Sequence, residues 1–237
     1  MQVKILFNSG SIEESLSIGW GVSFLIGDSV LFDTGEKGPS LLNNTKEMKI
    51  DLSLIQDVVI SHDHWDHTGG LWDILKQRQD INVYACPGFS NEFKRKVESS
   101  NNHLVENRDF MEISKDIYVT GEIRGEYQGG DIFEQAVVVD GDKGLTVITG
   151  CAHPGIVKIL DLVRKEFPAR PFYAVFGGFH LMNQHPRNIH SIIDVFKDLG
   201  VKKAGPTHCS GTEAENVFRE EYGNNFISTK IGEAVSI

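Results

Sequence analysis

Three imidazoles and two carboxylates, side chains of the types that bind metal ions, lie within six positions of the segment 61–70, Ser-His-Asp-His-Trp-Asp-His-Thr-Gly-Gly. His62 and His64 are two positions apart, so in an extended chain they point to the same side and can hold one ion together. Asp66 and His67 follow where the chain turns, and they can face a second ion. The alternative is a polar loop that is rich in histidine by chance, which does not account for so many donors in so few residues. The segment therefore predicts a metal site.

The residues on either side of this cluster predict the elements that position it. The apolar run 58–60 is typical of a short buried strand, and the apolar spacing within 71–75 is typical of a helix. The cluster would then lie between the end of a strand and the start of a helix. Proteins that alternate strands and helices place their ligand sites at such strand ends.

Three further histidines, His153, His180 and His208, occupy matching positions elsewhere in the chain. Each follows a short apolar run, precedes a predicted helix and is close to glycine or proline. Because the strand ends of such a fold gather along one edge, we expect these histidines to reach the cluster at 62–67. The other histidines, which lack this context, are expected at the surface: His103, His185 and His190. For His185 and His190, contact with the substrate is the alternative.

Apolar runs and turn signals divide the whole chain into short elements. The predicted strands cover residues 3–7, 22–26, 30–32, 58–60, 82–85, 117–119, 136–139, 145–148 and 172–176. The predicted helices cover residues 40–48, 71–75, 89–97, 156–163 and 189–196, with a last one after residue 211. A hairpin followed by strand and helix units occurs once in each half. This order predicts an α/β protein of two mixed β-sheets with helices outside, an αββα sandwich.

Two parts of the chain allow more than one interpretation. Asp33 ends the predicted strand 30–32, and it either supports the metal loop through hydrogen bonds or forms a simple turn. The segment 101–133 shows little periodicity beyond its one short strand, and its part 121–130 carries four glycines and has the composition of a loop. Such a loop is either a connector or a mobile rim over the site.

Composition limits the class of protein. The chain has 237 residues, of which 40% are hydrophobic, and this suits one globular domain over residues 1–237. The net charge of −10 and the lack of a basic face argue against binding to nucleic acid or to an anionic membrane. Three distant cysteines favour a reducing cytoplasm, and neither a signal peptide nor a membrane span is expected. We expect a small-molecule substrate, and the oligomeric state stays open.

The His-x-His-x-Asp-His pattern and the later histidines resemble the metallo-β-lactamase superfamily, and the resemblance extends over nearly the whole chain. It implies the four-layer αββα fold of that superfamily. It also assigns the ligands of two ions: His62, His64 and His153 for the first, and Asp66, His67 and His208 for the second. The motifs Gly-Cys-Ala-His-Pro-Gly, Phe-Gly-Gly-Phe-His and Pro-Thr-His-Cys-Ser-Gly resemble the branch that includes dihydropterin-ribofuranosylaminobenzene-phosphate synthases and many uncharacterised hydrolases.

One position departs from the pattern of the superfamily. Most members with two ions have an aspartate that bridges them, after the strand that follows the third histidine, whereas this chain has Gly-Gly-Phe and then His180. His180 is a candidate ligand to one ion, and Asp66 and His180 are the candidate catalytic residues. Two divalent ions, Asp66 and a hydroxide would leave two positive charges, so we expect an anionic group of the substrate to complete the coordination. Cys151 and Cys209 are interpreted as packing or supporting residues, with zinc ligation as the alternative.

The donor set and the resemblance together lead to an expected activity. Zinc is the first expectation for the ion, in one or two copies, with manganese or iron as alternatives. The expected reaction is hydrolysis of a small, anionic ester by a metal-bound hydroxide. One alternative is a transferase whose ions stabilise a diphosphate leaving group, and another is a non-catalytic protein that binds a metal or a small ligand. One scaffold hosts many chemistries, so the resemblance predicts the fold more firmly than the reaction.

Overall fold

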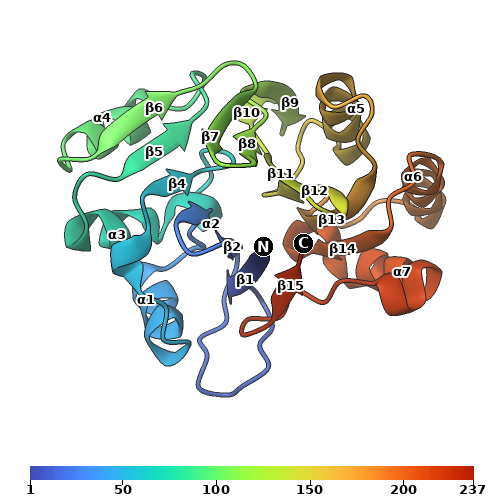
Figure 1. The fold of residues 1–237 in the computed structure, drawn as a ribbon, viewed down its shortest axis with the longest axis horizontal. Coiled ribbons are helices and arrows are strands. Elements are labelled where there is room, and N and C mark those ends of the chain that lie inside the picture. Colours follow the sequence, from blue (N-terminus) through green and yellow to red (C-terminus); the bar gives the residue numbers. More distant parts are fainter.

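Seven strands form the first β-sheet of the computed structural model, which describes residues 1–237. Their order is β15-β1-β2-β3-β4-β5-β6. Their bounds are β1 Gln2–Phe7, β2 Ser23–Ile26, β3 Val30–Phe32, β4 Asp57–Val59, β5 Asn82–Ala85, β6 His103–Glu106 and β15 Ala234–Ser236. β3 to β6 run parallel, and the pairs from β15 to β3 are antiparallel, so the sheet is mixed. The pairing of β15 with β1 brings the two termini together (Figure 1).

Six strands form the second sheet, in the order β14-β13-β12-β11-β8-β7. Their bounds are β7 Met111–Ser114, β8 Ile117–Val119, β11 Val137–Gly141, β12 Gly144–Thr149, β13 Phe172–Gly178 and β14 Lys203–Thr207. β12, β13 and β14 run parallel, and the remaining pairs are antiparallel. This sheet is therefore mixed as well.

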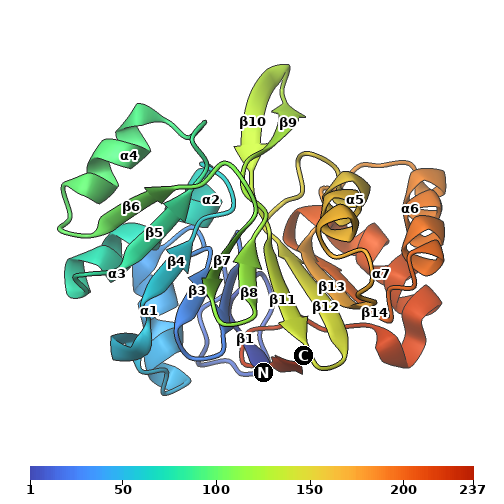
Figure 2. The same cartoon turned by 45° about the horizontal axis from the view of Figure 1, so that its top comes forward.

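Helices cover the outer face of each sheet. The first sheet carries α1 Gly38–Glu47, α3 Leu71–Gln77 and α4 Asn91–Glu98, and the second carries α5 Ile156–Glu166, α6 Pro186–Asp198 and α7 Gly211–Tyr222. Figure 2 shows the two sheets side by side in the middle of the molecule, with one group of helices on each flank. One further short helix, α2 Trp65–Thr68, follows β4. No helix of the structure combines the length and the apolar composition that a membrane span requires.

The apolar residues form three layers because neighbouring strand residues point to opposite faces of their sheet. On β4, Val58 packs in the outer layer under the helices, while Val59 packs in the layer between the sheets. On β13, Val175 packs in the outer layer under the helices, and Phe176 packs in the layer between the sheets. Phe176 meets Phe24 of the other sheet edge to face, with ring centroids 5.6 Å apart. This arrangement confirms the predicted αββα sandwich of two mixed sheets.

The parallel strands decide where the polar loops meet. β3 and β4 are parallel neighbours, so the segments after them, which begin with Asp33 and Ile60, lie at the same edge of the first sheet. β12, β13 and β14 are parallel neighbours in the second sheet, and His153, His180 and His208 follow them. Both edges face the same end of the sandwich, as the sequence predicts.

The glycine-rich segment predicted as a loop is a β-hairpin instead. β9 Ile123–Tyr127 pairs with β10 Gly130–Glu134, and the hairpin stands out from the sandwich at the top of Figure 2. Its two-residue turn has positive φ at both Gln128 (51°) and Gly129 (79°), which is the conformation of a type I′ turn. Gly125 lets the hairpin approach the loop of His153, because a Cβ there would lie 2.7 Å from the backbone nitrogen of Pro154.

Candidate metal centre

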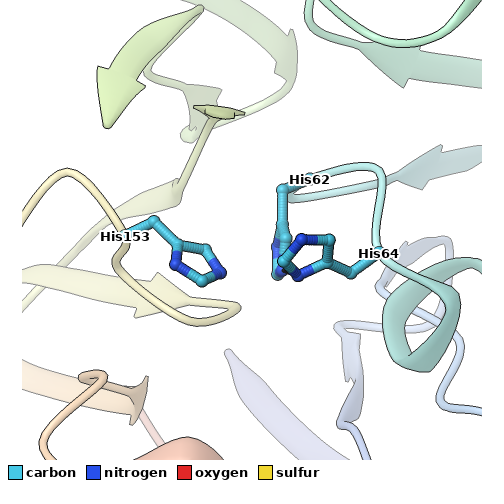
Figure 3. Close-up of side chains that lie close together, drawn as sticks. All are labelled: His62, His64 and His153. Carbon is cyan, nitrogen blue, oxygen red and sulfur yellow. Dashed lines mark hydrogen bonds between the residues drawn. The ribbon is translucent and has the colours of Figure 1, made fainter. Parts of the chain in front are cut away.

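The first predicted triad comes together across the two sheets. Donor atoms of His62, His64 and His153 all lie within 4.8 Å of one another. His62 is fully buried and the other two are half-buried. Figure 3 shows His62 and His64 on one loop and the ring of His153 approaching them from the opposite loop. The extended backbone at His64 (φ −102°, ψ 148°) agrees with the expectation that the first two histidines share one side.

The second predicted triad lies beside the first. Donor atoms of Asp66, His67 and His208 also lie within 4.8 Å of one another, and all three residues are buried. Asp66 Oδ2 is 3.6 Å from His67 Nε2 and 3.2 Å from His208 Nε2. Asp66 and His67 belong to helix α2, whose turn directs them away from the preceding extended segment. The structure therefore brings each predicted set of three together, and the two sets adjoin through His62 and His67, whose ring centroids are 4.1 Å apart.

A buried carboxylate supports the loop of the first sheet. Asp33 accepts hydrogen bonds from the Ser61 backbone nitrogen (2.7 Å) and from Ser61 Oγ (2.7 Å). Its Oδ2 is also 2.6 Å from His67 Nδ1, which fixes the ring so that Nε2 faces Asp66. Asp33 has a φ of 55°, so a turn and a hydrogen-bonding role coexist at this residue. Such a partner orients an imidazole ligand and sets its tautomer.

A second buried carboxylate supports the loop of the second sheet, and sequence reasoning missed it. Glu134 ends the hairpin strand β10 and is fully buried. It accepts hydrogen bonds from the backbone nitrogens of Cys151 (2.9 Å), Ala152 (2.7 Å) and His153 (2.7 Å). Burial raises the pKa of Glu134 to about 7, although these N–H groups favour its ionised form. The chain offers no local signal for this role, because Glu134 is far from the loop in sequence.

The structure explains why no carboxylate follows β13. A Cβ on Gly177 would collide with the Thr149 carbonyl oxygen, and one on Gly178 would collide with the Gly150 carbonyl oxygen and lie 2.8 Å from Cys209 Sγ. The first residue with room for a polar side chain is His180, which has a φ of 53° and is exposed at the site. Its ring centroid is 4.4 Å from that of His153.

Charges in the site set the protonation states of the candidate ligands. Burial and the neighbouring imidazoles lower the pKa of His153 to about 3 and that of His62 well below its ordinary value, so both rings are neutral. Burial opposes ionisation of Asp66, but the adjacent His208 and His67 rings outweigh it and lower the pKa of Asp66 to about 2. Burial also disfavours a charge on His67, yet the Asp33 carboxylate raises the pKa of His67 to about 9. Neutral imidazoles and ionised carboxylates are the forms that bind metals, so His67 differs from the others in that it would have to release a proton to an ion.

Both triads reach one cavity of about 530 Å³. His64 and His153 of the first triad and Asp66 and His208 of the second line it, together with His180. Three exposed aromatic side chains line it as well: Trp20, Trp65 and Tyr127. No lysine or arginine belongs to the lining.

Unpartnered nitrogens show that these residues fit a divalent ion. Both ring nitrogens of His153 and the Nε2 of His208 are buried and make no hydrogen bond within the protein. Buried polar atoms without a partner are rare, because each loses its hydration without compensation. A bound ion would satisfy them, and a set rich in imidazole suits zinc, iron or manganese. The ligand assignments themselves stay predictions.

Comparisons with known proteins agree with this geometry. A family model described as a β-lactamase superfamily domain matches residues 28–125. The chain is 31% identical to the 7,8-dihydropterin-6-methyl-4-(β-D-ribofuranosyl)-aminobenzene-5′-phosphate synthase of Methanocaldococcus jannaschii, over 91% of this chain and 89% of that protein. The chain belongs to the metallo-β-lactamase superfamily.

Solved structures of the metallo-β-lactamase superfamily share the fold over the full chain. The crystal structure of a metal-dependent hydrolase of the β-lactamase superfamily is 30% identical, with a TM-score of 0.82 and coverage of 100% of this chain and 99% of that chain. The metallo-β-lactamase fold protein YhfI from Bacillus subtilis is 14% identical, with a TM-score of 0.67. The match covers 99% of this chain and 98% of that chain. Membership in this superfamily supports an enzyme that binds a divalent metal ion, and it leaves hydrolase and transferase both open.

The remaining histidines lie outside the cavity. His185 caps helix α6 by accepting a hydrogen bond from the Arg187 backbone nitrogen, and His190 lies 3.9 Å from Glu221. His103 is exposed, with its Nε2 4.0 Å from Asp80. None of the three lines the cavity, in agreement with their interpretation as surface residues.

Replacing His62 and His64 by alanine should remove at least one tightly bound ion per chain, because their imidazoles supply two donors of the first triad. Elemental analysis of the purified wild type and variant measures this directly. His190→Ala is the matched control, since this histidine lies outside the cavity and should leave the metal content unchanged. Unchanged metal in the double variant would make the ligand assignment wrong.

Asp33→Asn should lower the binding affinity for one ion by about 10–100-fold, because the amide no longer offers two anionic acceptor oxygens to His67 and Ser61. Metal titration by calorimetry gives the affinity of each step. Asp63→Asn is the control within the same loop, because the Asp63 carboxylate accepts from the Ser90 backbone nitrogen rather than from a ligand. Equal losses in both variants would contradict a specific role for Asp33.

Proposed function

We propose that this protein is a metal-dependent hydrolase that acts on a small, anionic ester. One observation carries the proposal, namely that two triads of metal-binding side chains each have two members in the lining of a single cavity. The cavity volume of about 530 Å³ suits a small molecule. When bound there, divalent ions supply Lewis acidity and a water that ionises near neutral pH.

The chain's own residues position the reactants around the ions. Asp66 is ionised, and its Oδ2 lies between His67 Nε2 and His208 Nε2. It therefore can hold an ion and accept a hydrogen bond from the attacking water. Asp33 and Glu134 hold the two loops, so the triads need little rearrangement before reaction.

The preference for an anionic substrate follows from the lining of the cavity. A protein of net charge −10 repels anions over much of its surface. No lysine or arginine lines the cavity, so bound ions would be the main attraction for a phosphate or carboxylate there. At close range in a poorly solvated cleft, the charge of such ions dominates the local field.

His180 is proposed as the proton donor to the leaving group. It is exposed at the cavity, whereas the histidines of the second triad are buried. Contact with the Cys209 sulfur raises the pKa of His180, although burial opposes this, so a proton is available near neutral pH. A histidine in this state can act as a general acid.

A transferase is the second candidate, and two observations favour it. The relative from Methanocaldococcus jannaschii that shares 31% identity with this chain is named a synthase. The exposed aromatic side chains Trp20, Trp65 and Tyr127 all line the cavity, where they can stack on a flat ring. In such a reaction a carbon–oxygen bond to diphosphate breaks, a bond to an aromatic carbon or amine forms, and a proton is released.

A panel of chromogenic esters and phosphodiesters tests the two candidates. Metal-dependent turnover in water, lost on chelation and restored by zinc, is the expected result. Failure of every ester, with consumption of a pterin diphosphate only when an aromatic amine acceptor is present, would overturn the hydrolase in favour of the transferase. Tight binding of these ligands with no turnover of any kind would contradict both.

His180→Gln should slow the hydrolysis of substrates with poor leaving groups by about 10²–10⁴-fold, because such groups need a proton as they depart. Substrates with a nitrophenolate leaving group should be far less affected, since that anion leaves without a proton. Steady-state kinetics on paired phenyl and nitrophenyl esters provides the comparison. Equal losses on both esters, together with loss of metal, would show that His180 is a ligand and not a proton donor.

A further inference from the structure

The sulfur of Cys151 lies between the two predicted metal sites. Cys151 Sγ is within 4.8 Å of donor nitrogens of His62 and His153, which belong to the first triad. It is equally within 4.8 Å of donor nitrogens of His67 and His208, which belong to the second. No other cysteine has donors of both triads this close.

The backbone around Cys151 holds this sulfur in place. Its N–H donates to Glu134 Oε1 (2.9 Å), and its carbonyl accepts from the thiol of Cys209 (3.6 Å). The residue is 4% exposed and borders the cavity. Cys209 neighbours His208 and His180, whereas the Cys151 sulfur has donors of both triads within reach.

The distance from Cys151 Sγ to His67 Nε2 is 3.4 Å. Two ligands of one tetrahedral zinc ion, with Zn–S near 2.3 Å and Zn–N near 2.0 Å, lie about 3.5 Å apart. The observed separation, which is also that of a hydrogen bond between a thiol and an imidazole, therefore fits two donors that share an ion. The sulfur is directed at this nitrogen and is not packed only for its volume.

An independent observation comes from His208. This residue is 4% exposed, and its Nε2 makes no hydrogen bond within the protein. It lies 3.2 Å from Asp66 Oδ2 and within 4.8 Å of Cys151 Sγ. His208 thus has the Asp66 carboxylate of the second triad and the Cys151 sulfur among its close neighbours.

We propose that the Cys151 thiolate bridges the two metal ions, in the role that an aspartate has in most members of the superfamily with two ions. On binding, the Sγ–H proton leaves to solvent and the sulfur forms one bond to each ion. The thiolate contributes one negative charge, so two divalent ions, Asp66 and a hydroxide are left with one positive charge instead of two. The second ion is then held without help from a substrate anion. The proposal holds for hydrolase and transferase alike.

A thiol can take this role, because thiols that coordinate a divalent ion lose their proton.

X-ray absorption of the zinc-loaded protein, containing two ions per chain by elemental analysis, tests the bridge. A bridging thiolate gives an average of about one sulfur per zinc at about 2.3 Å. About half a sulfur per zinc would place the thiolate on one ion only, and no sulfur would leave Cys151 as a packing residue. Either result, or a protein that binds a single ion, overturns the proposal.

Cysteine variants identify the sulfur. Cys151→Ser should lose the sulfur scattering and bind the second ion more weakly. Cys86→Ser and Cys209→Ser should keep the sulfur scattering and the wild-type affinity for the second ion. If Cys151→Ser does not fold, the double variant of the other two cysteines leaves Cys151 as the only thiol of the chain. Retention of about one sulfur per zinc there supports the bridge. Loss of the sulfur signal in that double variant contradicts it.

Discussion

The close contact between the loops that follow β4 and β12 determines the site. A Cβ on Gly150 would collide with Ser61 Oγ and lie 2.9 Å from Asp33 Oδ2, so only glycine allows this approach. The contact joins the edges of two different sheets, and it sets His153 of one sheet against His62 of the other. Without it, each sheet would present an incomplete set of donors. The buried aromatic layer between the sheets, which includes Phe24 and Phe176, keeps the two edges at this separation.

Each loop has its own buried carboxylate, and the two work by different chemistry. Asp33 bonds to side chains and to one backbone nitrogen, so it controls the orientation of the His67 ring. Glu134 bonds to three successive backbone nitrogens, so it controls the path of the loop that carries Cys151 and His153. A buried carboxylate is stable only with such partners. These bonds hold the two loops through atoms other than the candidate metal donors.

The sequence is informative where function depends on neighbours along the chain. The spacing of His62, His64, Asp66 and His67 predicts both donor groups, and His153, His180 and His208 are recognisable because each follows an apolar strand. Glu134 and Cys151 act through partners far away in sequence, which depend on sheet register. The hairpin β9–β10 was predicted as a loop because its turn, Gln128-Gly129, lacks the usual asparagine or aspartate and its strands are largely exposed.

The glycines at the end of β13 and the position of the Cys151 sulfur belong to one packing arrangement. The end of β13 lies so close to the loop 150–151 that a Cβ on Gly178 would be 3.1 Å from the Cα of Cys151. No side chain, a carboxylate included, therefore fits at Gly178. The loop that makes this approach carries Cys151, whose sulfur lies within 4.8 Å of donors of both triads. The packing that keeps side chains out at the end of β13 thus also places this sulfur beside the triads.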